Sequence, residues 1–170
     1  MAESLLTKKA LADSLKEQLK IEPLDKICIA EICDRCNLNR KSFYYHFEDK
    51  PNLINWIFDT EYLSEASKKS YATQWESIEN LCRYLYLNKS FYKKVLKSQD
   101  AEHFTNHIRL IIEPIIKTAL ENQSNKEDIS RFKLSFYTDA VFLSLHNWLT
   151  HNTDMNWVDF SQELKLCLTP

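Results

Sequence analysis

Glycine is missing from all 170 residues of this chain, although it makes up about 7% of an average protein. Phosphate-binding loops and dinucleotide fingerprints need glycines where the backbone approaches a phosphate, so kinases, GTPases and Rossmann enzymes lose their main motif. Two-residue β-hairpins, which favour glycine, also become rare. The composition therefore favours an all-α chain.

Long apolar runs are lacking too. No stretch approaches the ~18 apolar residues of a membrane span, and the best run covers only 140–145. The first nine residues are charged early and have no apolar core of the signal-peptide kind. Five cysteines, an odd count, fit reduced thiols better than a disulfide framework. We therefore expect a soluble, cytoplasmic protein with no membrane partner.

Catalytic motifs and a basic charge balance are the remaining absences. No motif pairs a nucleophile with a base, so we expect neither an enzyme nor a cofactor. The net charge of −2 does not favour nucleic-acid binding, since such domains are usually basic. What the chain does have is 44% hydrophobic residues, enough to bury a sizeable core in one or two small domains.

Residues 39–50, Asn-Arg-Lys-Ser-Phe-Tyr-Tyr-His-Phe-Glu-Asp-Lys, are the most informative segment. Asn39 is a favoured N-cap residue, and Phe43 and Phe47 lie four apart on one helical face that we expect to be buried. The other side chains bring donors, hydroxyls and flat rings, the groups that contact phosphates and base edges. The pattern is typical of a DNA recognition helix.

The residues upstream complete a helix-turn-helix unit. The apolar residues of 29–33 repeat at the i, i+3, i+4 spacing of a short amphipathic helix. Asn37 suits a left-handed turn, and Leu38 provides an apolar plug between the two short helices. A first helix over 5–20 has leucines at i, i+4 and i+8 that would cover the pair.

Longer helices are predicted from residue 51 onward. Asp49 is placed to cap the first of them, and Pro51 lies where a first helical turn tolerates proline. Pro114 is expected to kink or interrupt its helix. The later helices are predicted over 75–87, 89–97, 101–122, 126–149 and 155–168, with loops at 122–125 and 151–154.

The apolar surface of 132–149 is too wide for one packing contact. Either this segment is an ordinary core helix, or part of it lies against a second copy of the chain, with a matching stripe in 157–168. Helix-turn-helix proteins bind two half-sites with a symmetry matched to the DNA. This requirement favours a homodimer.

The N-terminal motifs resemble the TetR family of bacterial transcriptional regulators, whose pattern ends in Leu-Tyr-x-His-Phe-x-x-Lys. Tyr44, His46, Phe47 and Lys50 match this ending. Over 7–53 the main departures are two cysteines and an asparagine in place of two alanines and a glycine. The resemblance implies an all-α fold in which a three-helix helix-turn-helix domain (1–50) precedes a helical effector-binding and dimerisation bundle (51–170).

The resemblance also implies a function. The chain would bind a palindromic double-stranded DNA operator as a homodimer, with its DNA affinity controlled by a small ligand in the C-terminal domain. Arg40 and Lys41 are the expected specificity determinants. The candidate DNA contacts are Asn39, Arg40, Lys41, Ser42, Tyr44, Tyr45, His46 and Lys50.

Control through a protein co-regulator is the alternative to a small ligand. Residues 88–96 and 136–149 resemble a branch of the family that includes the activator of dihydroxyacetone utilisation, and this branch implies such a co-regulator. An effector pocket would take its lining from aromatic and polar residues that also fit the core. The candidates are Trp75, Phe104, His107, Phe142 and His146.

Other features also have two interpretations. Cys33 and Cys36 have the spacing of a redox or zinc pair, but they also suit the small-residue positions of a tightly packed helix. His103 and His107 lie four apart without a third metal ligand, so we expect no metal site. His46 either contacts DNA or is a core residue. Finally, the acidic balance fits a helical interaction module that no longer binds DNA, although the exposed side of 39–50 argues against it.

Overall fold

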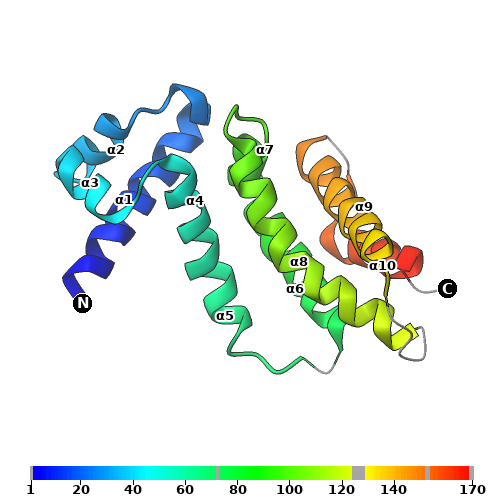
Figure 1. Ribbon diagram of the computed structural model, residues 1–170. Helices are drawn as coiled ribbons and strands as arrows, with labels where there is room; N and C mark the ends of the chain where they lie inside the picture. Colours follow the sequence, from blue (N-terminus) through cyan, green and yellow to red (C-terminus); the bar gives the residue numbers. More distant parts are fainter. Residues whose placement is uncertain (1, 72, 124–128, 152–153, 169–170) are drawn as a thin grey trace.

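The computed structural model describes residues 2–71, 73–123, 129–151 and 154–168, and in these ranges the chain is helical without strands (Figure 1). This confirms the predicted all-α class. The first helices form an N-terminal lobe, and α4 leads from it to the longer C-terminal helices. The elements are α1 (Ala2–Ile21), η1 (Leu24–Lys26), α2 (Ile29–Arg35), α3 (Arg40–His46), α4 (Lys50–Phe58), η2 (Asp59–Leu63), α5 (Ser64–Ala66), α6 (Gln74–Leu87), α7 (Lys89–Leu96), α8 (Ala101–Gln123), α9 (Arg131–Thr150) and α10 (Trp157–Leu168).

The N-terminal lobe packs α1 over α2 and α3, as its leucine stripe predicts. Leu11, Leu15 and Leu19 of α1 are almost fully buried. They share one core with Ile32 of α2 and Phe43 of α3. Each such side chain stabilises the fold by about 1.5–3 kcal/mol when it leaves water, so this small core can hold three short helices in place.

The turn between α2 and α3 is made by Asn37 in the left-handed conformation, with φ of 54°. The amide of Asn37 donates to the carbonyl of Asp34 at 3.2 Å, and the amide of Leu38 donates to the carbonyl of Cys33 at 2.9 Å. This pair of bonds is the Schellman ending of a helix, in which glycine usually occupies the left-handed position. Asparagine replaces it here, in a chain without glycine.

Replacing Asn37 tests this account of the turn. Asn37→Ala is expected to lower the free energy of unfolding by about 1 kcal/mol, because a Cβ without a compensating polar group is strained in this region. Asn37→Gly should be at least as stable as the natural chain. Urea unfolding followed by circular dichroism measures both variants. Equal stabilities of the alanine and glycine variants would contradict the turn geometry.

Helix α4 begins as predicted and then continues further than the sequence indicates. The Asp49 carboxylate accepts a hydrogen bond from the Asn52 amide at 2.8 Å, and Pro51 lies in the first turn. After Phe58 the helix widens into the π-helical turn η2 and runs on as α5. This extension carries the chain out of the N-terminal lobe and along the C-terminal helices (Figure 1).

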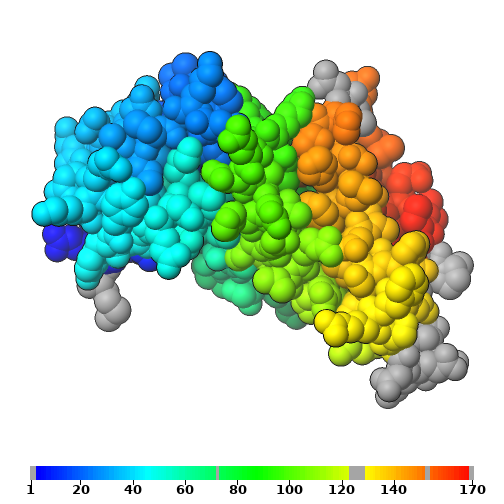
Figure 2. All heavy atoms as spheres, turned by 45° about the horizontal axis from the view of Figure 1, so that its top comes forward, coloured from blue at the N-terminus to red at the C-terminus, as the bar shows by residue number. Residues whose placement is uncertain are grey.

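An aromatic cluster fills the centre where α4 meets the C-terminal helices. Phe58 contacts the rings of Tyr62, Tyr84, Tyr92 and Phe104, at centroid distances of 5.1 to 6.0 Å. Tyr92 also stacks on Phe104 at 5.1 Å. The two lobes consequently merge into one continuous surface, with α2 and α3 at the outer margin of the N-terminal lobe (Figure 2).

The course of α8 at Pro114 and the starts of α9 and α10 differ from the sequence-based predictions. Helix α8 is not interrupted at Pro114, where both the proline and the Leu110 preceding it by one turn are exposed to water. Helix α9 begins at Arg131, behind a cap in which the Lys133 amide donates to the Ser130 hydroxyl; the predicted start at 126–128 lies outside the described residues. Helix α10 begins at Trp157, two residues later than predicted.

Candidate nucleic-acid interface

Asn39 and Ser42 build the start of α3. The Asn39 side-chain oxygen accepts hydrogen bonds from the Ser42 amide at 2.9 Å and from the Ser42 hydroxyl at 3.2 Å. Such a cap satisfies a backbone donor that the first helical turn otherwise leaves free. The two predicted DNA contacts therefore first serve to fix where the helix begins.

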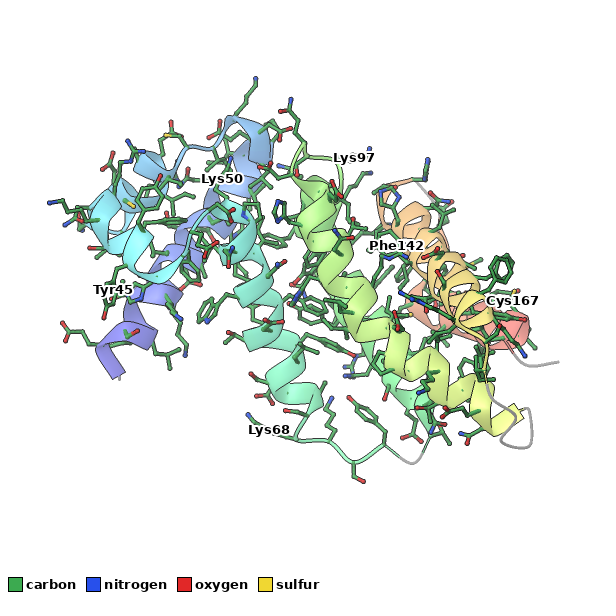
Figure 3. All side chains as sticks on the ribbon, viewed as in Figure 1. Tyr45, Lys50, Lys68, Lys97, Phe142 and Cys167 are labelled. Carbon is green, nitrogen blue, oxygen red and sulfur yellow. The ribbon has the colours of Figure 1, made fainter. Side chains whose placement is uncertain are left out.

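Four predicted DNA contacts, Arg40, Lys41, Tyr44 and Tyr45, lie exposed on the outside of α3. Tyr45 is 83% exposed, which is unusual for a large aromatic ring, and it lies at the margin of the lobe (Figure 3). Arg40 donates to the Tyr44 hydroxyl at 3.4 Å and stands 5.9 Å from the centre of its ring. The helix thus presents a guanidinium, an ammonium and two phenols to the solvent.

His46 lies at the other end of α3, beside Lys8 of α1. The Lys8 ammonium is 5.5 Å from the ring centre of Phe47 and 5.9 Å from that of Trp56. Partial burial, and then the charge of Lys8, lower the pKa of His46. The ring is therefore neutral at pH 7 in the free protein. The two distances from its ammonium to the rings place Lys8 on the same surface as α3.

An NMR titration of the His46 ring is expected to give a pKa below its ordinary value of 6.5. Lys8→Met should raise this pKa without restoring it fully, because burial is the larger cause. Between the lowered pKa and about 6.5, the His46 ring binds more protons in the unfolded chain than in the folded protein. The free energy of unfolding is therefore highest above this pH window and decreases as the pH falls through it. A pKa at or above 6.5 in the folded protein would exclude this arrangement.

Lys50 is the one predicted contact that the structure places elsewhere. Its ammonium donates to the carbonyl of Leu24 at 2.9 Å and to that of Ile27 at 2.8 Å. Leu24 is the first residue of η1 and Ile27 caps its end, so the side chain points into the N-terminal lobe (Figure 3). Lys50 therefore ties η1 to the start of α4, a structural role that the motif alone does not indicate, and its contact with DNA stays a prediction.

The cysteines and histidines with metal-like spacing have other surroundings. Burial raises the pKa of the Cys33 and Cys36 thiols, and thiols that stay protonated are poor nucleophiles and poor zinc ligands. His107 is within 2.6 Å of the Asp59 carboxylate, across from η2. Within the described ranges, no group of three or more His, Cys, Asp or Glu side chains is placed to hold a metal ion.

The candidate effector residues are dispersed over the C-terminal helices. Phe104 is fully buried in the aromatic cluster, and His107 packs against the edge of Phe58. Phe142 contacts His146 on α9, with ring centres 6.2 Å apart. Trp75 is half-buried on α6. Core packing therefore occupies Phe104, whereas the other four candidates are only partly buried.

The fold and the exposed helix define a regulator built on a helix-turn-helix unit. Residues 73–169, more than half of the chain, match the TetR family described as "Transcriptional regulator C-terminal region". The chain therefore belongs to the TetR family of transcriptional regulators, as its N-terminal motifs predict. Members of this family are regulators and not enzymes, in agreement with the missing catalytic motifs.

Individual relatives indicate the branch. The chain is 27% identical over 106 residues to the HTH-type dhaKLM operon transcriptional activator DhaS of Lactococcus lactis subsp. lactis (strain IL1403). The aligned segment covers 61% of this chain and only 57% of that relative. The chain thus matches a little over half the length of this curated relative. This similarity confirms the predicted resemblance to the branch of the family that contains DhaS.

Solved structures are similar over nearly the whole chain. The structure of the dihydroxyacetone kinase operon activator DhaS has a TM-score of 0.70 at 20% identity, covering 96% of this chain and 94% of that one. The TetR transcriptional regulator from Streptococcus agalactiae 2603V has a TM-score of 0.72 at 18% identity, covering 99% and 97%. At these identities the likeness shows the fold. Among the described residues, no helix is both long and apolar enough to span a membrane.

Proposed function

We propose that this protein binds double-stranded DNA through α3, which enters the major groove with Arg40 and Lys41 toward the bases. The observation that carries the proposal is the second helix of a helix-turn-helix unit with exposed cationic and phenolic side chains. In such units the N-terminal residues of the second helix contact base edges. Arg40 and Lys41 occupy these positions, whereas His46 and Lys8 at the other end are placed for phosphates.

The protein binds its operator as a homodimer through α9. Phe132 is 81% exposed and Phe136 is 58% exposed, and both lie with Ala140 and Leu143 on one exposed stripe of this helix. An apolar stripe of this length on a surface marks an interaction site. A second copy satisfies it and at the same time supplies the second recognition helix that a palindromic operator needs.

A hollow near the other end of α9 fits this dimer. It has a volume of about 360 Å³, and its lining is Ser144, Asn147, Trp148, His151, Met155 and Phe160. In a two-fold symmetric contact, if residue i of one copy meets residue j of the other, then residue j of the first copy also meets residue i of the second. With the axis between Ala140 and Leu143, Phe136 of one copy meets residue 147 of the other, at the hollow. The dimer would therefore insert Phe136 into this hollow twice.

DNA affinity is controlled through the C-terminal helices, by a protein co-regulator in preference to a small ligand. The aromatic cluster around Phe58 supports the co-regulator, because its rings pack on one another in the centre of the domain. A similarity to DhaS, named as a transcriptional activator, points to the same branch. A chain that keeps the fold but no longer binds DNA is the other alternative, and the exposed side of α3 argues against it.

Selection from a random-sequence duplex pool at moderate salt tests the proposal. We expect recovery of an inverted repeat, because two copies of α3 related by a two-fold axis read the same bases on opposite strands. The affinity should fall moderately with salt, since few cations face the DNA. Absence of any enriched sequence, from protein shown to be folded, would favour the interaction module or a missing co-regulator.

A further inference from the structure

The π-helical turn η2 lies where the two lobes meet. It spans Asp59–Leu63 in the middle of a helical run that begins with α4 in the N-terminal lobe and ends with α5. A π turn places an extra residue in the helix and re-aims the side chains around it, and such turns are frequent at functional sites. The carboxylates that this turn presents are Asp59 and Glu61.

Glu61 makes contacts to both lobes. One carboxylate oxygen pairs with the ammonium of Lys16, on α1 of the N-terminal lobe. The other accepts a hydrogen bond from the Tyr84 hydroxyl at 3.3 Å, on α6 of the C-terminal helices. The Tyr84 hydroxyl is in turn 2.8 Å from that of Tyr92 on α7. One side chain thus connects α1, η2, α6 and α7.

The C-terminal side of this connection is fixed. Burial raises the pKa of both phenols, so Tyr84 and Tyr92 stay protonated and keep donating. Tyr92 is fully buried and stacks on Phe104. Asp59, on the same turn, is held by His107 of α8 at 2.6 Å. The turn is therefore anchored firmly to the C-terminal helices.

The contact of Glu61 with the N-terminal lobe is weak by comparison, and it lies apart from the Lys94 ammonium of α7, which holds the last carbonyls of α1. The Lys16 and Glu61 side chains are 26% and 37% exposed, and ion pairs with this much solvent contribute little to stability. A contact that orients one lobe on the other without adding much stability can be changed by small forces. This asymmetry distinguishes Glu61 from the buried residues around it, whose loss would unfold the protein.

We infer that Glu61 is a positioning residue, which sets the orientation of the recognition helix by holding α1 through Lys16 and the C-terminal helices through Tyr84. The inference rests on the proposed function, since orientation matters only where two recognition helices must reach two half-sites together. It assigns to Glu61 no contact with DNA, because Glu61 lies at the opposite end of α4 from α3.

The test compares binding to a full palindromic operator with binding to a duplex that holds one half-site. The full-site advantage is the ratio of the affinity for the full operator to that for the half-site. In Glu61→Ala, Lys16→Met and the double variant it should fall about 5-fold or more, and to the same extent in all three, because each variant interrupts the same connection between α1 and the C-terminal helices. Half-site affinity should not change. The control is the ion pair between Glu65 of α5 and Lys68 in the turn that follows, 2.6 Å apart, altered as Glu65→Ala and Lys68→Met. These variants should keep the full-site advantage.

Equal losses on the full site and the half-site would overturn the inference, because they would indicate a general effect on stability. An unchanged full-site advantage would overturn it as well. If the natural protein binds no operator, the proposed function fails instead. A second measurement then still decides the role of Glu61. It is the distribution of distances between spin labels at residues 34 and 117, in protein whose Cys28 and Cys167 are replaced by serine. A broader distribution in Glu61→Ala than in Glu65→Ala supports the inference, and equal distributions refute it.

Discussion

The double variant Arg40→Ala, Lys41→Ala is expected to lose specific operator binding by on the order of 100-fold or more. Each good contact between such a side chain and a base edge contributes about 1–3 kcal/mol of discrimination, and both residues stand at the start of α3. Competition binding of the selected operator against random duplex DNA measures the change. The free energy of unfolding and the oligomeric state should stay as in the natural protein, since both side chains are exposed.

A charge-matched control separates base contact from net charge. Lys97 and Lys117 are exposed on the C-terminal helices, and their replacement by alanine removes the same two charges. This variant should bind the operator within about 2-fold of the natural protein, because charges farther away than the Debye length of ~10 Å are screened. Equal losses in the two double variants would show that α3 has no special role and would favour the interaction module.

Much of this interface follows from local sequence patterns. The N-cap of Asn39, the buried pair Phe43 and Phe47, and the turn at Asn37 depend on neighbours within four residues, so spacing alone predicts them. The exposure of Arg40 and Lys41 follows from the same periodicity. The all-α class and the family were predictable for the same reason. The domain boundary at residue 50 is still a prediction.

The rest depends on contacts between distant segments. Lys50 belongs to a motif, yet its ammonium turns to carbonyls more than twenty residues upstream, which no local pattern indicates. The π turn at Asp59–Leu63 arises where carboxylates meet Lys16 and His107 from other helices. Pro114 is tolerated because its helical face is exposed to water. In each case tertiary contacts or solvent override the local preference.

Phe136→Glu is expected to convert the dimer to a monomer. The two-fold axis places the substitution in the interface twice, and a well-packed aromatic anchor contributes at least about 2 kcal/mol, so the dimer should weaken by about 4 kcal/mol, or roughly 1000-fold. Operator affinity should then fall to that of a single half-site. Sedimentation equilibrium measures the oligomeric state, and circular dichroism should show an unchanged fold, because the ring is 58% exposed in one copy.

Leu87→Glu is the matched control, since Leu87 is 69% exposed at the end of α6, away from the α9 stripe. It adds the same charge to an exposed apolar residue and should leave the dimer intact. Asn147, which the proposed symmetry places opposite Phe136 of the other copy, offers a second check. Asn147→Trp fills the hollow that Phe136 enters and should also weaken the dimer. If the hollow were unrelated to Phe136, the dimer would tolerate this substitution. Dimers that persist in both Phe136→Glu and Asn147→Trp would rule out the two-fold contact through α9.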